Sequence, residues 1–243
     1  MQETSNIFGI RAIIEAIQAG QTLEKVYILK GLSSSLFSEL NNILKKESIS
    51  TSYVPVEKLD RLSKNNNHQG VIAKISAIDF ADLETLLAEN KVEKPLYLLL
   101  DQITDVRNFG AIIRTAECTG VAAIIIPSQG SAPLNADAIK TSAGAAFKIP
   151  ICKVNHLLDA IYQLKAEDIN IVAITEKTSN SLYQTDLTNP TALIMGSEYK
   201  GISTSILKNA DIKAKLPLLG EIESLNVSVA CGVALYETVR QRQ

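Results

Sequence analysis

Long apolar runs separated by polar loops dominate the second half of the chain. Four of these runs carry almost no polar side chains, and they are Leu96–Leu100, Val121–Ile126, Ile169–Ile174 and Thr191–Met195. A further strand is predicted at Ile212–Leu216. Strands of a parallel sheet produce such runs, because helices cover the sheet on both faces. The pattern therefore predicts an α/β domain with a parallel sheet, followed by a final helix.

The first part of the chain has a different pattern, which predicts two helices and several short strands. A helical spacing of apolar residues starts at Ile7 and Phe8 and continues to Ile17, so a helix is predicted that ends at Gly20. Ser35–Lys46 predicts a second helix. Three short strands are predicted as well, and they lie at Lys25–Leu29, Thr51–Val54 and Gly70–Ile75. These elements indicate a small α/β domain.

The composition changes between the two regions. Residues 77–94 are rich in acidic side chains and are followed by Pro95, which predicts a short amphipathic helix within a solvated linker. We therefore expect three parts, namely a small domain (1–76), a linker (77–94) and a larger domain (95–243). The last helix is predicted from about Val227 to Arg240.

Composition and charge narrow the classes of function. The chain has 243 residues, of which 46% are hydrophobic, and no apolar run approaches the roughly 20 residues that span a bilayer. The polar N-terminus shows no export signal, so we expect a cytoplasmic protein without a membrane partner. The net charge of −2 argues against binding of nucleic acid through bulk electrostatics. It does not exclude a nucleic-acid-binding protein whose positive charges are clustered on one face.

The cysteines give no sign of a metal site. Cys118, Cys152 and Cys231 are far apart, odd in number and set among apolar residues. They have neither the spacing of metal ligands nor that of a disulfide framework, so buried free thiols and no bound metal are expected.

Three segments that carry polar side chains follow predicted strands, and we call them the polar segments. They are Asn108–Ala116, Gly196–Ser203 and Ser224–Ala230. Each segment also has an ordinary structural interpretation. Asn108 is suited to cap one helix, and either Ser224 or Asn226 is suited to cap the last helix. Arg114 and Glu198 are compatible with a solvated surface.

In this order, the three segments resemble the signature motifs of the SpoU (TrmH-type) RNA ribose 2′-O-methyltransferases, of the knotted methyltransferase superfamily. The branch that methylates guanosine in 23S rRNA is the most similar. Ile7–Ile10 and Asn67–Val71 also resemble the small RNA-binding domain that is often fused to this catalytic domain. The resemblance implies a deep trefoil knot in the C-terminal domain, a homodimer and S-adenosylmethionine as the cofactor.

The resemblance also implies roles for individual residues. Arg114 would activate the ribose hydroxyl, and Asn108, Glu198 and Asn226 would lie in the active site. The cofactor contacts that it implies are Met195, Gly196, Leu216, Leu218, Leu225 and Ser228. Val106-Arg107 stands where the family often has proline followed by a polar residue, which affects loop stiffness but leaves Asn108 and Arg114 in place.

Other functions remain open at this point. A transfer-RNA methyltransferase is the first alternative to a 23S rRNA enzyme. A non-catalytic RNA-binding or assembly protein of the same fold is another, although the intact Arg114, Glu198 and Asn226 argue against it. A dinucleotide-binding oxidoreductase is disfavoured, because no Gly-x-Gly-x-x-Gly segment follows a strand.

Overall fold

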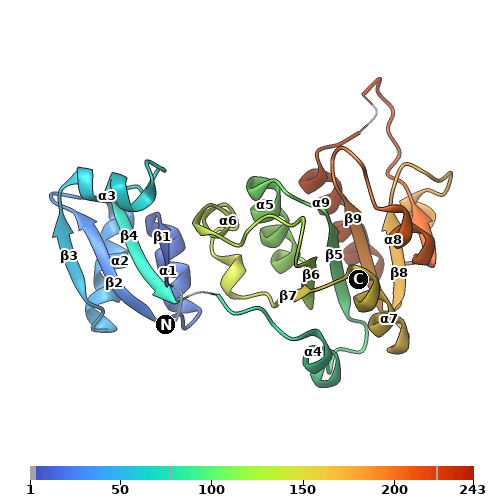
Figure 1. Ribbon diagram of the computed structural model, residues 1–243, viewed down its shortest axis with the longest axis horizontal. Coiled ribbons are helices and arrows are strands. Elements are labelled where there is room, and N and C mark those ends of the chain that lie inside the picture. The colour runs from blue at the N-terminus through green and yellow to red at the C-terminus, as the bar shows by residue number, and fades with distance from the viewer. Residues whose placement is uncertain (1–3, 77, 223) are drawn as a thin grey trace. The chain divides into compact units, whose positions relative to one another are not determined.

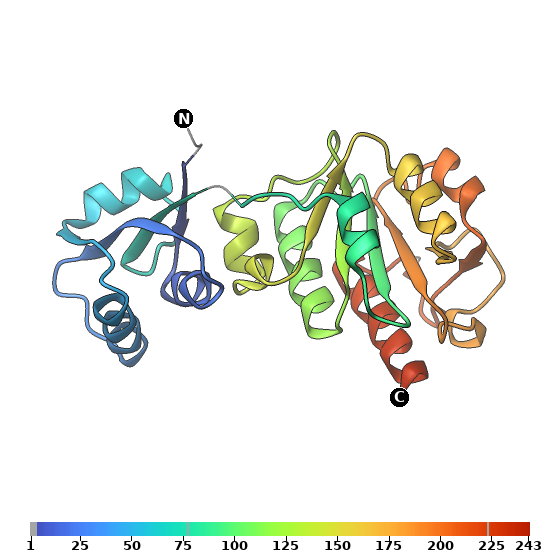
Figure 2. The same cartoon turned by 90° about the horizontal axis from the view of Figure 1, so that it is seen from below.

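The computed structural model describes residues 4–76, 78–222 and 224–243, which group into two compact units (Figures 1 and 2). Unit 1 comprises Met1–Asp79 and Leu134–Lys148, and unit 2 comprises Phe80–Pro133 and Ile149–Gln243. No helix among the described residues has the length and apolar character that a membrane span requires.

Unit 1 contains a four-stranded sheet in the order β1-β4-β2-β3. Only β2 and β3 pair in parallel, and β4 is antiparallel to both of its neighbours. The strands are β1 (Thr4–Phe8), β2 (Leu23–Leu29), β3 (Thr51–Val54) and β4 (Val71–Ser76). The three predicted strands are confirmed.

The first strand corrects the sequence interpretation. Ile7 and Phe8, which were expected to begin a helix, belong to β1 and pair with Ala73 and Ile72. Both side chains are buried, because alternate residues of β1 face the two packed sides of the sheet. Gly9, with a φ of 96°, then separates the strand from the helix.

Helices cover both faces of this sheet. α1 (Ile10–Gln18) and α2 (Ser35–Lys46) lie on one face, and α3 (Val56–Ser63) lies on the other (Figure 2). α2 has the predicted bounds, and its N-cap Ser34 accepts a hydrogen bond from the Phe37 backbone N–H at 3.1 Å. α3 was not predicted. Unit 1 also includes α6 (Ala136–Thr141) and the 3₁₀ helix η1 (Ala145–Phe147).

Unit 2 is built on a six-stranded sheet in the order β10-β8-β9-β5-β6-β7, and every neighbouring pair is parallel. The strands are β5 (Leu96–Asp101), β6 (Ala123–Pro127), β7 (Ile151–Val154), β8 (Asn170–Ile174), β9 (Thr191–Gly196) and β10 (Ile212–Ala214). The expected parallel sheet is confirmed. β7 escaped prediction because only its first two residues are buried. The trefoil knot stays a prediction.

Helices flank the sheet of unit 2 in two groups. α5 (Val106–Cys118) and α9 (Val227–Arg242) pack together on one face. The other face carries α4 (Leu83–Glu89), α7 (Leu157–Ala166) and α8 (Thr204–Asn209), and the 3₁₀ helix η2 (Leu182–Gln184) precedes β9. α4 lies within the stretch expected to be a linker, and its Leu83 joins the buried core of unit 2.

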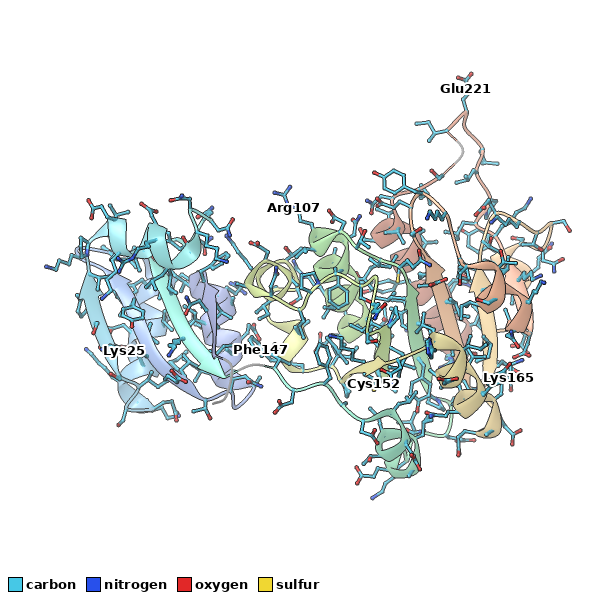
Figure 3. All side chains as sticks on the ribbon, viewed as in Figure 1. Lys25, Arg107, Phe147, Cys152, Lys165 and Glu221 are labelled. Atoms are coloured by element: carbon cyan, nitrogen blue, oxygen red, sulfur yellow. The ribbon has the colours of Figure 1, made fainter. Side chains whose placement is uncertain are left out.

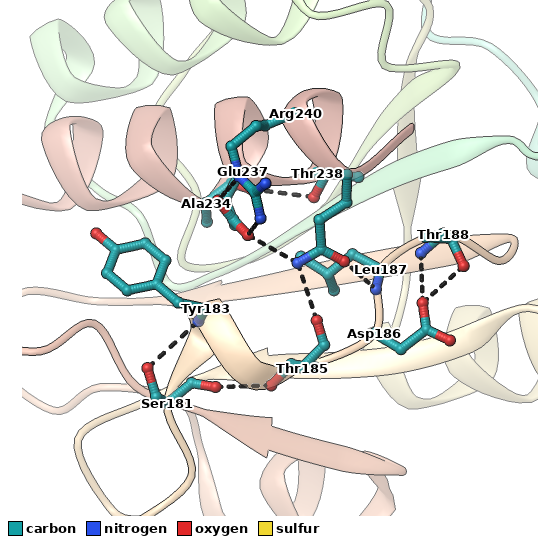
Figure 4. Close-up of polar contacts among 11 residues, drawn as sticks. Ser181, Tyr183, Thr185, Asp186, Leu187, Thr188, Ala234, Glu237, Thr238 and Arg240 are labelled. Carbon is teal, nitrogen blue, oxygen red and sulfur yellow. Dashed lines mark hydrogen bonds and ion pairs between the residues drawn. The ribbon is translucent and has the colours of Figure 1, made fainter. Parts of the chain in front are cut away.

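The C-terminal part of α9 is anchored to the loop before β9 (Figure 4). The Gln241 side chain donates to the Thr185 carbonyl at 3.0 Å and to Glu237 at 2.7 Å, and accepts from the Leu187 N–H at 2.9 Å. The hydrogen bond from the Arg240 guanidinium lowers the pKa of Glu237. These bonds fix the helix whose N-terminal end carries the third polar segment.

The thiols differ in exposure, which corrects one expectation. Cys118 is exposed at the end of α5, whereas Cys152 and Cys231 are buried. Burial raises the pKa of Cys152 to about 11 and that of Cys231 to about 12, so both thiols stay protonated at pH 8. We expect a disulfide reagent at pH 8 to react rapidly with Cys118 alone and with all three thiols after denaturation. Rapid reaction of native Cys118→Ser protein would contradict this assignment.

Candidate active site

The three polar segments meet at one edge of the sheet of unit 2. The first segment begins after β5, the second leaves β9 at Gly196, and the third leads into α9. The carboxyl ends of parallel strands lie at the same edge, which is where open α/β sheets bind ligands.

Three side chains, one from each segment, form a hydrogen-bonded triangle that we call the polar cluster. Asn108 Nδ2 donates to Glu198 Oε1 at 2.6 Å. Asn226 Nδ2 donates to the same Glu198 oxygen at 3.1 Å and to Asn108 Oδ1 at 3.0 Å. Residues up to 118 positions apart in the sequence are thus joined. One carboxylate oxygen accepts both amides, which fixes the orientation of Glu198.

Asn226 combines its two possible roles. Its Oδ1 caps α9 by accepting from the Ser228 N–H at 2.9 Å and the Val229 N–H at 3.4 Å. Its Nδ2 at the same time reaches Glu198 and Asn108. The start of α9 therefore sets the position of the amide in the polar cluster.

Asn108 does not cap α5. Asp105 is the N-cap, and its carboxylate accepts from the Asn108 N–H at 2.7 Å. Asn108 is the third residue of the helix, so its side chain is available to Glu198. The capping interpretation of Asn108 was wrong because the cap lies three residues earlier.

The second segment forms a tight turn that only glycine permits at its base. The Ser197 N–H donates to the Gly201 carbonyl at 3.2 Å, and the Gly201 N–H donates to the Ser197 carbonyl at 2.9 Å. A Cβ on Gly196 would lie 2.2 Å from backbone atoms of Gly201 and Ile202. Gly201 itself has a φ of 65°. The close backbone crossing holds Glu198 at the edge of the sheet.

Asp101 supports this turn and was missed in the sequence. It is the last residue of β5, it is buried, and its Oδ2 accepts from the Ser203 N–H at 2.6 Å. A carboxylate at the end of an otherwise apolar strand was the available signal, because a buried charge requires a partner.

A cavity of about 330 Å³ opens beside the second and third segments. Five of the six expected cofactor contacts line it, and these are Met195, Gly196, Leu216, Leu218 and Leu225. Glu198 lines it as well. Sequence reasoning missed Ile174, Thr175, Glu176 and Lys215, which lie where β8 and β10 end. Their place at strand ends was the signal that could have found them.

Ser228 contacts the polar cluster and does not line the cavity. Its Oγ donates to Asn226 Oδ1 at 2.6 Å. Ser228 therefore helps to orient Asn226. Ser228 thus lies next to the residues expected to be catalytic, and it is not among the five cofactor contacts that line the cavity.

Arg114 is an expected site residue that belongs neither to the polar cluster nor to the cavity lining. It is exposed on α5, lines no part of the cavity and forms no hydrogen bond or ion pair with any described residue. This exposure agrees with the interpretation of Arg114 as a solvated surface residue, because its neighbours Ile112 and Ile113 form the buried side of α5. Arg107, two helical turns earlier, is also exposed, near the start of α5 (Figure 3).

A metal site is not found in the part of the chain that the structure describes. No group of three or more His, Cys, Asp or Glu side chains converges there in a way that could hold an ion. The described residues offer amides, carboxylates, exposed cations and the cavity for the chemistry of the site.

Two family models match separate parts of the sequence. The SpoU rRNA Methylase family matches residues 95–236, and the model for RNA 2′-O ribose methyltransferase substrate binding matches residues 6–81. The first match spans more than half of the chain. The chain belongs to the SpoU rRNA methylase family. This SpoU methylase is an RNA 2′-O-methyltransferase, and the expected enzyme class and α/β fold with a parallel sheet are confirmed.

Similar proteins extend over the whole SpoU methylase chain. The 23S rRNA (guanosine-2′-O-)-methyltransferase RlmB of Pasteurella multocida is 38% identical over 98% of this chain and 99% of its own. The putative TrmH family tRNA/rRNA methyltransferase YacO of Bacillus subtilis is 33% identical, over 99% and 97%. The SpoU methyltransferase AviRb of Streptomyces viridochromogenes has a similar structure, with a TM-score of 0.83, 26% identity, and coverage of 98% of this chain and 90% of its own. AviRb is also known in complex with AdoMet.

Proposed function

We propose that this SpoU methylase transfers a methyl group from S-adenosylmethionine to the ribose 2′-hydroxyl of a guanosine in 23S rRNA. The observation that carries the proposal is the polar cluster of Asn108, Glu198 and Asn226 beside the cavity. The similarity to the Pasteurella rRNA enzyme over both complete chains supports the substrate.

The cavity has the chemistry that the cofactor requires. Its volume of about 330 Å³ is within the range of small-molecule sites, about 300–1,000 Å³. Met195, Leu216 and Leu225 offer apolar walls, and Glu176 and Glu198 add carboxylates to the lining. When bound, S-adenosylmethionine supplies a methyl group that its sulfonium has already activated.

The residues of the chain act on the acceptor hydroxyl. A ribose hydroxyl is a weak nucleophile until its proton leaves, so the developing oxyanion needs a nearby positive charge. We assign this electrostatic role to Arg114, because a guanidinium group offers a fixed positive charge and does not act as a base. Glu198, held through Oε1 by two amides, retains Oε2 for a hydrogen bond to the ribose. An RNA phosphate adjacent to the ribose is our proposed proton acceptor.

We further propose that two copies form a homodimer through the face of α9. Val229 and Tyr236 lie seven residues apart on this helix, so they share one side, and they are 52% and 55% exposed. Large apolar side chains in this arrangement favour burial against a second copy.

Unit 1 is our candidate for RNA recognition. Among its loop residues, His68 is used internally, because Nε2 lies 3.1 Å from Asp60 Oδ1 and Nδ1 accepts from the Gly70 N–H at 3.0 Å. Lys64 and Arg11 are exposed and suited to phosphate contacts. We therefore place RNA contacts on these cations and assign His68 to the structure of the loop.

The test uses RNA from a strain that lacks the gene. Purified protein with radiolabelled S-adenosylmethionine should methylate 23S rRNA from that strain and leave its transfer RNA unlabelled, and EDTA should not change the rate. Mapping of the 2′-O-methyl group should locate it on one guanosine. Methylation of transfer RNA would favour the alternative substrate class, and incorporation into neither RNA would favour a non-catalytic RNA-binding role.

A further inference from the structure

Tyr199 is the most exposed of the large hydrophobic side chains that line the cavity. It follows Glu198 and is 95% exposed. Four other exposed tyrosines, which are Tyr53, Tyr162, Tyr183 and Tyr236, are only 52–55% exposed. An aromatic ring that is left almost wholly in water contributes little to folding, because its apolar area stays hydrated. Its position at the active site points instead to a ligand that covers it.

The backbone under Tyr199 is well defined. The turn is closed by the paired hydrogen bonds of Ser197 and Gly201, and the Lys200 N–H donates to Ser197 Oγ at 3.1 Å. The ring is therefore carried by a turn that is already ordered, so a ligand that stacks on it does not have to order the loop first.

The ring is better placed for RNA than for the cofactor. The cavity already has apolar walls, formed by Ile174, Met195 and Leu225. A ring that covered the cavity would lose much of its exposure to these walls, but Tyr199 retains nearly all of it. Tyr199 is also next in sequence to Glu198, the carboxylate of the polar cluster that we assign to the ribose.

Lys200 adds a cation to the same turn. Its side chain is exposed, and none of the described residues forms an ion pair with it. An exposed aromatic ring beside a cation is the pairing by which proteins hold unpaired nucleotides, with the ring against a base and the cation against phosphate.

We propose that Tyr199 stacks on an unpaired base of the RNA substrate, at or next to the methylated nucleotide, and that Lys200 contacts the adjoining phosphate. This inference rests on the proposed function and adds a determinant of substrate choice. The enzyme then selects a nucleotide whose base has left its helical stack, because a paired base cannot cover the ring.

Three substitutions separate stacking from simple apolar contact. Tyr199→Ala and Tyr199→Leu should raise the KM for RNA about tenfold, the effect typical of losing one base–aromatic stack. Tyr199→Phe should stay near wild type, because the ring is retained. The affinity for S-adenosylmethionine should be unchanged in all three, and Tyr183→Ala serves as the control for loss of an exposed tyrosine elsewhere in unit 2.

The absence of tryptophan from the chain allows a direct measurement. Tyr199→Trp introduces the only tryptophan of the chain at the proposed contact, and its emission can be excited apart from that of the tyrosines. Addition of an unmethylated 23S rRNA fragment should quench its emission, whereas S-adenosylmethionine alone should not. Lys200→Ala in this background should weaken the RNA titration and make it less dependent on salt.

The two sets of results keep this inference separate from the proposed function. If wild-type protein methylates 23S rRNA and Tyr199→Leu keeps the wild-type KM, the stacking role is wrong while the function stands. Quenching by S-adenosylmethionine alone would overturn the inference in favour of a cofactor contact. If the wild-type protein methylates no RNA, the proposed function fails, and the fluorescence titration still decides whether RNA covers the ring.

Discussion

Arg114→Ala should reduce the turnover of 23S rRNA methylation by about 100- to 1000-fold, which is the range for loss of a group that stabilises a developing oxyanion. The affinity for S-adenosylmethionine should be preserved, because Arg114 does not line the cavity. Arg114→Lys should remain far below wild type, since a point charge does not reproduce the planar guanidinium. Single-turnover rates and cofactor titration measure the two effects separately.

Arg107 offers a matched control on the same helix. It is also exposed, and it lies two turns before Arg114. Arg107→Ala removes the same charge and should alter the KM for RNA by a few-fold at most, without lowering turnover. Equal losses of turnover in the two alanine variants would reduce Arg114 to one of several phosphate contacts. Wild-type turnover in Arg114→Ala would remove it from the mechanism.

The sequence predicted the sheet of unit 2 well, because strands covered on both faces must be apolar throughout. It predicted the start of unit 1 poorly. The apolar residues of Ile7–Ile17 fit one helical period, yet Gly9 divides them between a strand and a helix. A strand that is buried on both faces has no alternation of polar and apolar residues to distinguish it from a helix.

The sequence named several residues that the structure brings together, but it did not show how they are connected. The amide of Asn226 caps α9 through its oxygen and donates to Glu198 through its nitrogen. Local sequence could show the first role but not the second, because Glu198 is 28 residues away in the chain. It also could not place Arg114, whose exposure depends on which side of α5 packs. Asp101 was overlooked because it ends an apolar strand and its partner, the Ser203 N–H, is 102 residues away.

The turn at Gly196 connects fold and site most directly, so it supports the second large prediction. Gly196→Ala should weaken S-adenosylmethionine binding by more than about tenfold, in line with the effect of overpacking a close contact. The added Cβ would meet backbone atoms of Gly201 and Ile202 at 2.2 Å, and backbone cannot move aside as a flexible side chain can. The turn would have to shift, and with it the cavity wall and Glu198.

Gly220→Ala is the matched control for this change, because nothing lies within 4 Å of the Cβ that it adds and Gly220 does not line the cavity. Its cofactor affinity and melting temperature should equal those of the wild type. Ser197→Ala tests the same turn more gently, since it removes the acceptor of the Lys200 N–H and one polar group of the cavity lining, and it should weaken binding by a few-fold. Calorimetric titration, with circular dichroism to confirm folding, distinguishes these outcomes. Wild-type cofactor affinity in folded Gly196→Ala protein would show that the crossing of the two backbone segments does not shape the cofactor site.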